Sequence, residues 1–311
     1  MGVTRSAAIA ILSTGLGLLA AACDSDGDLV GEAVEFRPGG SGIRYDTAFL
    51  GAYTWTEVAL TGSPWPKVTA ELLDCDIIVV IDGRLRCIDL EDKVHGGKKL
   101  LGSTWTLEIE GEPVDLVLAD MAWSDALGRP RYTFVDSEGA PVCDENPRRP
   151  GDFGALVAAD VVVDRATGEV HSKPDILRIS CVGAAVGGAG DAFGWLPDEL
   201  GPDAFQAALR ATRLDRCGDG ESLTTAEDFA AIHVRDSFGV NDFSAEAPAV
   251  SEGVYGPKGM ICSGGRTRGG DKVTAPIECP DGHTIPLCSE AELAAAFGAG
   301  GPAVWVKPLA Q

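Results

Sequence analysis

The sequence predicts a β-rich α+β fold, in which an antiparallel sheet forms the body, a few short helices accompany it, and disulfides staple it together. Three observations lead to this prediction. Apolar runs between residues 43 and 200 are short and bounded by Gly and Asp, as strands and their turns are. Helical periodicity is confined to a few short segments after residue 200. Nine cysteines occur in 311 residues, of which 45% are hydrophobic, enough for a sizeable core.

The first strand pair is predicted from an Asp-Gly dipeptide. Residues 77–81 are apolar and lead through Asp82-Gly83 into residues 84–88. Asp-Gly between two apolar runs is typical of a two-residue hairpin turn. In that register Cys87 faces Ile78 rather than Cys75. Either the register differs, or these two cysteines have other partners.

A second hairpin is predicted where residues 105–109 turn at 110–112 into residues 114–118, because both arms alternate between apolar and polar side chains. Turns are predicted at 136–139 and 165–168. Further strands are predicted at residues 132–135, 160–164 and 176–182.

The clearest helix is predicted within residues 202–217. At ~100° per residue, one face carries Phe205 and the residues that follow it at helical spacing, so the helix is one-sided. Asp203 is expected to cap its first turn, and Gly218 to end it in the left-handed conformation. Cys217 then lies at the helix end, where a disulfide would attach the helix to the body. The apolar face carries Phe205, Ala208, Leu209 and Thr212, and another face carries Gln206, Arg210 and Arg213.

Two shorter helices are predicted from Ser/Thr-x-x-Glu capping boxes, at residues 224–231 and 289–297, the second ending at Gly298. A Gly-rich segment at 188–194 follows a predicted strand, as phosphate loops do. Its spacing is one residue too long for the dinucleotide fingerprint. We therefore predict an irregular turn there, and no cofactor.

The N-terminus predicts an export signal over residues 1–22. An apolar run of secretory length ends in small residues before Cys23. We expect Cys23 to be lipidated, as in bacterial lipoproteins, with the protein anchored to the outer membrane or to the periplasmic face of the inner membrane. The alternative is an ordinary signal peptide that leaves Cys23 as a structural thiol. A polar tether is expected over 23–42, an N-terminal β region over 43–100, and a disulfide-rich domain over 101–311.

Cysteine counting favours lipidation of Cys23, since an even number then remains for four disulfides in an oxidising compartment. Their connectivity cannot be read from the sequence. The four histidines are far apart. Although His283 lies between two cysteines, as in some zinc sites, export favours a disulfide, and we predict no metal. The remaining cysteines are Cys75, Cys87, Cys143, Cys181, Cys217, Cys262, Cys279 and Cys288.

The formal charge of −22 and the pI near 4.4 argue against a nucleic-acid partner, which would require clustered Lys and Arg. No second apolar run of spanning length follows the leader. The expected membrane contact is therefore the lipid alone.

One set of motifs is distributed along the second half of the chain. It consists of Leu214-Asp215-Arg216-Cys217, Gly218-Asp219-Gly220, Ile179-Ser180-Cys181-Val182-Gly183 before Gly194-Trp195, Ile232-His233-Val234-Arg235-Asp236, Ile261-Cys262 and Thr267-Arg268. In these motifs the chain resembles the ADYC-domain family of bacterial envelope lipoproteins, named for an Ala-Asp-Tyr-Cys motif usually followed by Gly-Asp-Gly. The resemblance covers roughly residues 100 to 311, and two of the four naming residues differ. It implies an envelope location and a disulfide architecture, and carries no established activity.

The biochemical activity is not predicted, and a non-enzymatic role is favoured. One alternative is a surface module that binds a glycan or a protein, which exposed tryptophans lining one groove would favour. The other is a hydrolase in which Asp236 orients His233. No Gly-x-Ser-x-Gly or His-Glu-x-x-His motif supports it. Asp219, between two glycines, either closes a turn through its own side chain or binds a ligand.

Overall fold

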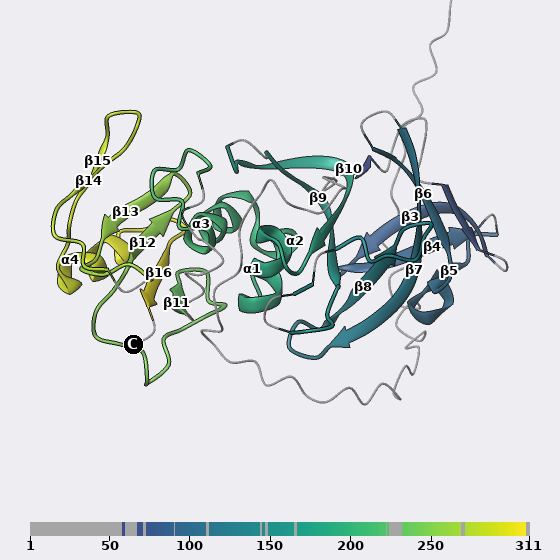
Figure 1. Cartoon of the computed structure of the whole chain (residues 1–311), viewed down its shortest axis with the longest axis horizontal. Coiled ribbons are helices and arrows are strands. Elements are labelled where there is room, and N and C mark those ends of the chain that lie inside the picture. The colour runs from purple at the N-terminus through teal and green to yellow at the C-terminus, as the bar shows by residue number, and fades with distance from the viewer. Residues whose placement is uncertain are drawn as a thin grey trace, which may run out of the picture. The chain divides into compact units, whose positions relative to one another are not determined.

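A computed structural model describes the fold (Figure 1). All the described residues belong to the unit Val34–Gln311. The predicted signal (1–22), Cys23, the tether (23–42) and the helix at 224–231 lie outside them. The described residues are 58–59, 67–70, 73–89, 91–109, 112–143, 145–146, 149–164, 167–221, 223, 232–268 and 271–308.

In the described part of the chain, ten strands form one antiparallel sheet, in the order β1-β10-β9-β8-β7-β6-β2-β3-β4-β5. The β-rich prediction is confirmed. The sheet takes strands from both sides of residue 100, where the sequence suggested a boundary between two regions. The strands are β1 Val58–Ala59, β2 Lys67–Ala70, β3 Leu73–Ile81, β4 Arg84–Asp89, β5 Val94–Gly96, β6 Thr104–Ile109, β7 Glu112–Ser124, β8 Arg129–Val135, β9 Ala155–Val163 and β10 Val170–Cys181.

The Asp82-Gly83 hairpin joins β3 and β4 in the predicted register as far as Ile77, with Ile78 opposite Cys87. The register then shifts between Ile77 and Cys75, so that Cys75 lies opposite Asp89, two residues from Cys87 along β4. A disulfide between Cys75 and Cys87 is therefore compatible with this hairpin. Asp82 and Gly83 both have positive φ, at 51° and 67°, as a two-residue hairpin turn requires. The turn therefore fixes Asp82 at the tip of the hairpin. This position matters below, because Asp82 lines a cavity.

The second hairpin pairs β6 with β7 and sets Trp105 opposite Leu116. Trp105 is fully buried, packs edge-on against Phe134 and donates its indole N–H to Ser103 Oγ at 2.7 Å. Strands β8, β9 and β10 correspond to the other three predicted strands, and each begins earlier than the sequence suggested. Residues of β4 and of β6 to β10 share a hydrophobic core that includes Trp105.

The prediction of an irregular turn at 188–194 was wrong, because this segment forms most of helix α1 (Ala185–Phe193). Gly194 ends the helix in the left-handed conformation, with φ 68°. Small residues let α1 approach the end of β10 closely. A Cβ on Gly187 would lie 2.3 Å from the carbonyl oxygen of Cys181, too close for any side chain.

Helix α3 (Pro202–Arg213) confirms the predicted helix, but its ends differ from the prediction. Its N-cap is Gly201, and no side chain caps the first turn. Leu214, with φ 56°, takes the left-handed position at the C-terminus that the sequence analysis gave to Gly218. The face opposite Phe205 is also buried. The short helix α2 (Pro197–Leu200) and the 3-10 turn η2 (Gly97–Leu100) complete this part of the chain.

A second antiparallel sheet follows, in the order β11-β16-β12-β13. One face carries the core that includes Phe205 of α3, and the other carries a smaller core with Leu293 of α4. Helix α4 begins with the predicted capping box, in which Ser289 and Glu292 bond each other's backbone N–H. The elements are β11 Ile232–Asp236, β12 Gly253–Gly256, β13 Gly259–Ser263, β16 Val304–Pro308, α4 Glu290–Gly298 and a small pair, β14 Ile277–Glu278 with β15 Thr284–Ile285.

Three disulfides join segments that are distant in sequence, and Cys87 is also disulfide-bonded. Disulfides persist in extracellular or periplasmic space, so these bonds indicate such a compartment. No helix among the described residues is long and apolar enough to cross a membrane. The disulfides pair Cys143 with Cys181, Cys217 with Cys279, and Cys262 with Cys288.

Candidate functional site

The segment that follows α3 folds around the carboxylate of Asp215, which is fully buried. One oxygen, Oδ2, accepts hydrogen bonds from the Arg210 guanidinium and from the backbone N–H of Gly220, the latter at 3.0 Å. The other, Oδ1, accepts from the N–H of Gly218 at 2.9 Å. Asp215 thus closes the glycine loop and neutralises a buried Arg at the same time.

Gly218 is required where this loop crosses the β12–β13 turn. Its φ is +72°, and a Cβ there would lie 2.0 Å from the carbonyl oxygen of Lys258. Beside the crossing, the N–H of Met260 donates to the carbonyl of Arg216 at 2.7 Å, and Cys217 is bonded to Cys279. The loop is therefore clamped by a close backbone contact, a hydrogen bond and a disulfide.

The polar face of α3 is covered by the turn between β9 and β10. Gln206 accepts the N–H of Val170 at 2.6 Å and donates to the carbonyl of Gly168 at 2.7 Å. Arg210 donates to the carbonyl of Thr167 at 2.7 Å. These side chains, which sequence alone placed on a polar face, are buried because they satisfy backbone groups of the turn.

The C-terminus of α3 is held by a buried ion pair between Arg268 and Glu252, each 1% exposed in its side chain. Arg268 donates to both Glu252 oxygens, at 2.9 and 2.7 Å, and to the carbonyls of Ala211 and Thr212. Burial alone lowers the pKa of Arg268, but the Glu252 carboxylate more than offsets this and raises it. Arg268 therefore stays charged and fixes the helix end to the second sheet.

These contacts describe a structural cluster and not an open site. Arg210, Asp215, Glu252 and Arg268 are all buried, and each is occupied by protein partners. Buried charges are tolerated where they are paired with an opposite charge and hydrogen-bonded, as Arg210 is with Asp215 and Arg268 with Glu252. The cluster therefore holds α3, the glycine loop and the second sheet together.

The three candidate site residues lie apart. Asp219 is exposed and accepts the N–H of Glu221 at 3.0 Å, which closes a turn through its own side chain. His233 and Asp236 are three residues apart in β11, so their side chains point to opposite faces of the sheet. The structure does not bring the three together.

Asp236 organises the loop that follows β11. Its Oδ2 accepts the indole N–H of Trp195 at 2.9 Å and both the backbone and the side-chain N–H of Asn241, at 2.8 and 3.0 Å. Its Oδ1 accepts the N–H of Val240 at 2.9 Å. A carboxylate with four N–H donors already in place has no capacity left to orient a histidine.

His233 forms a hydrogen bond through Nδ1 with Ser244 Oγ, at 3.1 Å. Burial lowers the pKa of His233; nearby Glu246 opposes this shift and Lys307 adds to it. The imidazole is therefore neutral at pH 7. Among the described residues no carboxylate is hydrogen-bonded to it, so the third member of a hydrolytic triad is missing there.

The described tryptophans do not line a groove. Trp105 and Trp195 are fully buried, and Trp305 is nearly so. Trp123 is more exposed, and the Arg84 guanidinium covers its ring at 4.6 Å from the centroid. The sugar-stacking arrangement that the sequence left open is therefore not found in the described part of the chain. Two further tryptophans, Trp55 and Trp65, lie outside the described residues.

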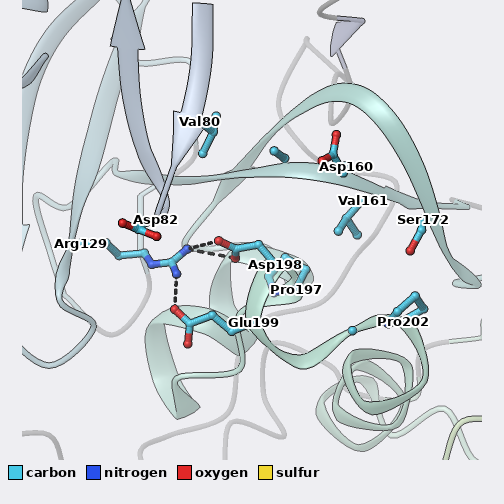
Figure 2. Close-up of a pocket in the computed structure, with 12 residues that line it drawn as sticks. Val80, Asp82, Arg129, Asp160, Val161, Ser172, Pro197, Asp198, Glu199 and Pro202 are labelled. Carbon is cyan, nitrogen blue, oxygen red and sulfur yellow. Dashed lines mark hydrogen bonds and ion pairs between the residues drawn. The ribbon is translucent and has the colours of Figure 1, made fainter. Parts of the chain in front are cut away.

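A cavity of about 410 Å³ opens instead beside Arg129, at the start of β8. Figure 2 shows Asp82, Asp198 and Glu199 around the Arg129 guanidinium, with Asp160 on β9 further along the wall. The volume is in the range of small-molecule sites. The other lining residues are Val80, Ala159, Val161, Ser172, Pro197, Gly201 and Pro202.

Arg129 connects the first sheet to α2 through this cavity. Its Nη1 donates to both Asp198 oxygens at 3.1 Å, and its Nη2 contacts Glu199 (Figure 2). Asp198 and Glu199 lie in the first turn of α2, behind Pro197. Pro at the start of a helix followed by two acidic residues is a local signal, but it marks a helix start and not a cavity.

The cavity does not have the geometry of a metal centre. Nowhere in the described part of the chain do three or more His, Cys, Asp or Glu side chains gather so that they could hold a metal ion. The two cysteines that flank His283 are taken up in disulfides, Cys279 with Cys217 and Cys288 with Cys262.

Comparison with known proteins places these observations in a family. The ADYC domain family model matches residues 97–268, more than half of the chain. No curated protein and no solved structure matches it. The matched range contains the Asp215 loop and ends at Arg268, so it contains the whole ionic cluster that holds α3 in place. The chain belongs to the ADYC domain family.

Proposed function

We propose that this protein is exported, is anchored in the cell envelope by a lipid on Cys23, and acts there as a binding module and not as an enzyme. The observation that carries the first part is the use of the cysteines. Seven of the eight cysteines after Cys23 are disulfide-bonded. Disulfide formation on this scale requires an oxidising compartment, hence export.

The position of Cys23 supports the anchor. It follows small residues at the end of an apolar leader. The six cysteines paired above leave Cys87 with Cys75 or Cys23 as its partner. If Cys75 takes that role, Cys23 is available for acylation. Several acyl chains on one cysteine hold a protein at a membrane far more firmly than one chain does.

Three observations support a binding role: the surroundings of His233, the burial of the tryptophans, and the cavity beside Arg129. His233 has Ser244 as its partner and lies on the other face of its strand from Asp236, which disfavours a hydrolase. The buried tryptophans disfavour a glycan platform. A mixed apolar and acidic cavity beside Arg129 is open to a ligand. We therefore favour a protein or small-molecule ligand over a glycan.

The test of the anchor compares the wild-type chain with C23S after expression in a Gram-negative host. We expect wild type in the membrane fraction, with a mature N-terminus at an acylated Cys23, and C23S in the soluble periplasmic fraction. Density-gradient separation then assigns the wild type to the outer or the inner membrane. Equal membrane association of both proteins, or an unmodified Cys23 in the mature chain, would contradict the proposal.

A further inference from the structure

We propose that the cavity beside Arg129 binds its ligand through a primary ammonium or guanidinium group. The group is carried either by a small polyamine or by a Lys or Arg side chain of a partner polypeptide. This inference rests on the binding role proposed above and names the ligand class of that same cavity. It does not depend on the lipid anchor.

The charge of the cavity wall is the first argument. Asp82, Asp198 and Glu199 stand around the single guanidinium of Arg129, and a fourth carboxylate, Asp160, lies further along the wall (Figure 2). Arg129 is already paired with Asp198 and Glu199. Asp82, Asp198 and Glu199 alone already outnumber the one guanidinium, so the wall carries an excess of negative charge. A concave wall focuses that potential on a ligand inside it.

The spread of the carboxylates distinguishes an organic cation from a metal ion. Asp82 lies at a hairpin tip, Asp160 on β9, and Asp198 in α2. They surround a space of about 410 Å³ and do not converge on one point, in keeping with the absence of a metal cluster among the described residues. A metal ion needs several oxygen ligands within about 2.6 Å of one point, whereas an extended amine can form ion pairs with carboxylates that lie apart.

The apolar part of the wall suits the stem of such a ligand. Val80, Val161, Pro197 and Pro202 line the same cavity as the acidic groups. The methylene chain of a polyamine or of Lys buries apolar surface while its charged end reaches a carboxylate. A cavity of this mixed composition thus matches an alkyl ammonium ion more closely than it matches a neutral sugar or an anion.

A buried polar atom beside the cavity gives the second, independent observation. Ser180 Oγ has no hydrogen-bond partner among the described residues, although Ser180 is only 6% exposed. Ser180 lines a recess of about 10 Å³, which shares the residues Arg129 and Pro197 with the cavity. A recess of that size admits one polar atom.

Unsatisfied buried polar groups carry a free-energy cost, and native proteins retain them chiefly where a ligand, an ion or a water molecule satisfies them. We assign the recess to a polar atom of the ligand, or to a water that the ligand contacts, where the recess adjoins the cavity at Arg129 and Pro197. The carboxylates at the wall then hold the cationic end.

The test is calorimetric titration of the detergent-solubilised full-length protein with three probes: spermidine, a blocked hexapeptide with one central Lys, and the same peptide with norleucine in place of Lys. We expect spermidine, the Lys peptide or both to bind, and the norleucine peptide to bind at least about tenfold more weakly. Binding of spermidine alone identifies a small ligand, and binding of the Lys peptide alone identifies a polypeptide partner.

Single substitutions test whether the probes bind in this cavity. D82N should weaken the bound probe about fivefold, and higher salt should weaken it further. Asn tolerates the positive φ of Asp82, so this variant keeps its backbone. The matched control D125N removes the same charge from an exposed residue that does not line the cavity, and should bind like wild type. S180A should weaken binding about fivefold.

Several outcomes would overturn the assignment. Failure of both cationic probes to bind wild type is one, and equal binding of the norleucine peptide is another. Equal loss of affinity in D82N and D125N would show that the net charge of the protein, and not the cavity, determines the affinity for the probe. An unchanged affinity in S180A would show that the ligand does not use the recess. The membrane fractionation of C23S is independent of all these results, so the anchor and the ligand class can fail separately.

Discussion

Asp215 accepts a hydrogen bond from the guanidinium of Arg210 inside the core, where the side chain of Asp215 is completely buried and that of Arg210 nearly so. The two residues lie five apart, one within α3 and one just beyond its end. Asp215 is the residue that this chain shares with the acidic position of the family motif. Its role here is to hold the glycine loop against the helix. In this chain the acidic residue of the motif therefore stabilises the fold.

Loss of the Asp215 carboxylate should strongly destabilise the fold. D215N removes the charge that compensates Arg210 and weakens the hydrogen bonds to Gly218 and Gly220. Removing one partner of a buried ion pair costs about 3–5 kcal/mol of unfolding free energy. Urea denaturation under oxidising conditions measures this loss.

The control for this experiment is D219N, in the same glycine loop. The side chain of Asp219 is exposed and bonds the N–H of Glu221. D219N should therefore change the unfolding free energy by no more than about 0.5 kcal/mol. Similar losses in D215N and D219N would contradict a structural role that is specific to Asp215.

Substitution of Gly218 should be more damaging than substitution of a glycine with a similar backbone conformation elsewhere. G218A adds a Cβ 2.0 Å from the carbonyl oxygen of Lys258, at a φ of +72°. Gly282 has a φ of +88° and nothing within 4 Å of an added Cβ, so G282A tests the cost of the backbone conformation alone. We expect G282A to lose about 1 kcal/mol and G218A several kcal/mol, measured by thermal and urea unfolding.

A yield of folded G218A equal to that of G282A, with the same midpoint, would show that the loop can move away from Lys258. The close crossing of the two segments would then not be required for stability.

The local parts of the fold were predictable, and the parts that depend on distant contacts were not. The Asp82-Gly83 turn and the Ser289 capping box were found because each signal lies within four residues. Helix α1 was missed because its glycines read as a turn. The small size of Gly187 and Gly190 is explained by tertiary contacts, because a Cβ on Gly187 would meet the Cys181 carbonyl and a Cβ on Gly190 would meet the side chains of Leu156 and Leu196.

The candidate cavity was not predictable for the same reason. Asp82, Arg129 and Asp198 are far apart in sequence, and no spacing rule joins them. The candidates that sequence did select, among them His233 and Asp236, are close in sequence but point to opposite faces of a strand.

The partner of Cys87 can be identified by mass spectrometry. Cys87 is disulfide-bonded, and six other cysteines pair among themselves, which leaves Cys23 and Cys75. Since the anchor proposal assigns a lipid to Cys23, we expect non-reducing peptide mapping to recover Cys87 linked to Cys75. A peptide that links Cys87 to Cys23 would contradict both this pairing and the lipid anchor.

Stability should fall on acidification through the titration of His233. Burial lowers the pKa of His233 in the folded protein below its ordinary value near 6.5. Below that value the unfolded chain binds a proton that the folded chain resists, so the free energy of unfolding decreases as the pH falls. Urea midpoints at about pH 7.5 and about pH 5.5 should therefore differ more in wild type than in H233Q, which cannot titrate. The control is H171Q, at an exposed position, which should retain the wild-type difference between the two midpoints. An identical pH dependence in H233Q and wild type would exclude His233 as the source of the pH-dependent stability.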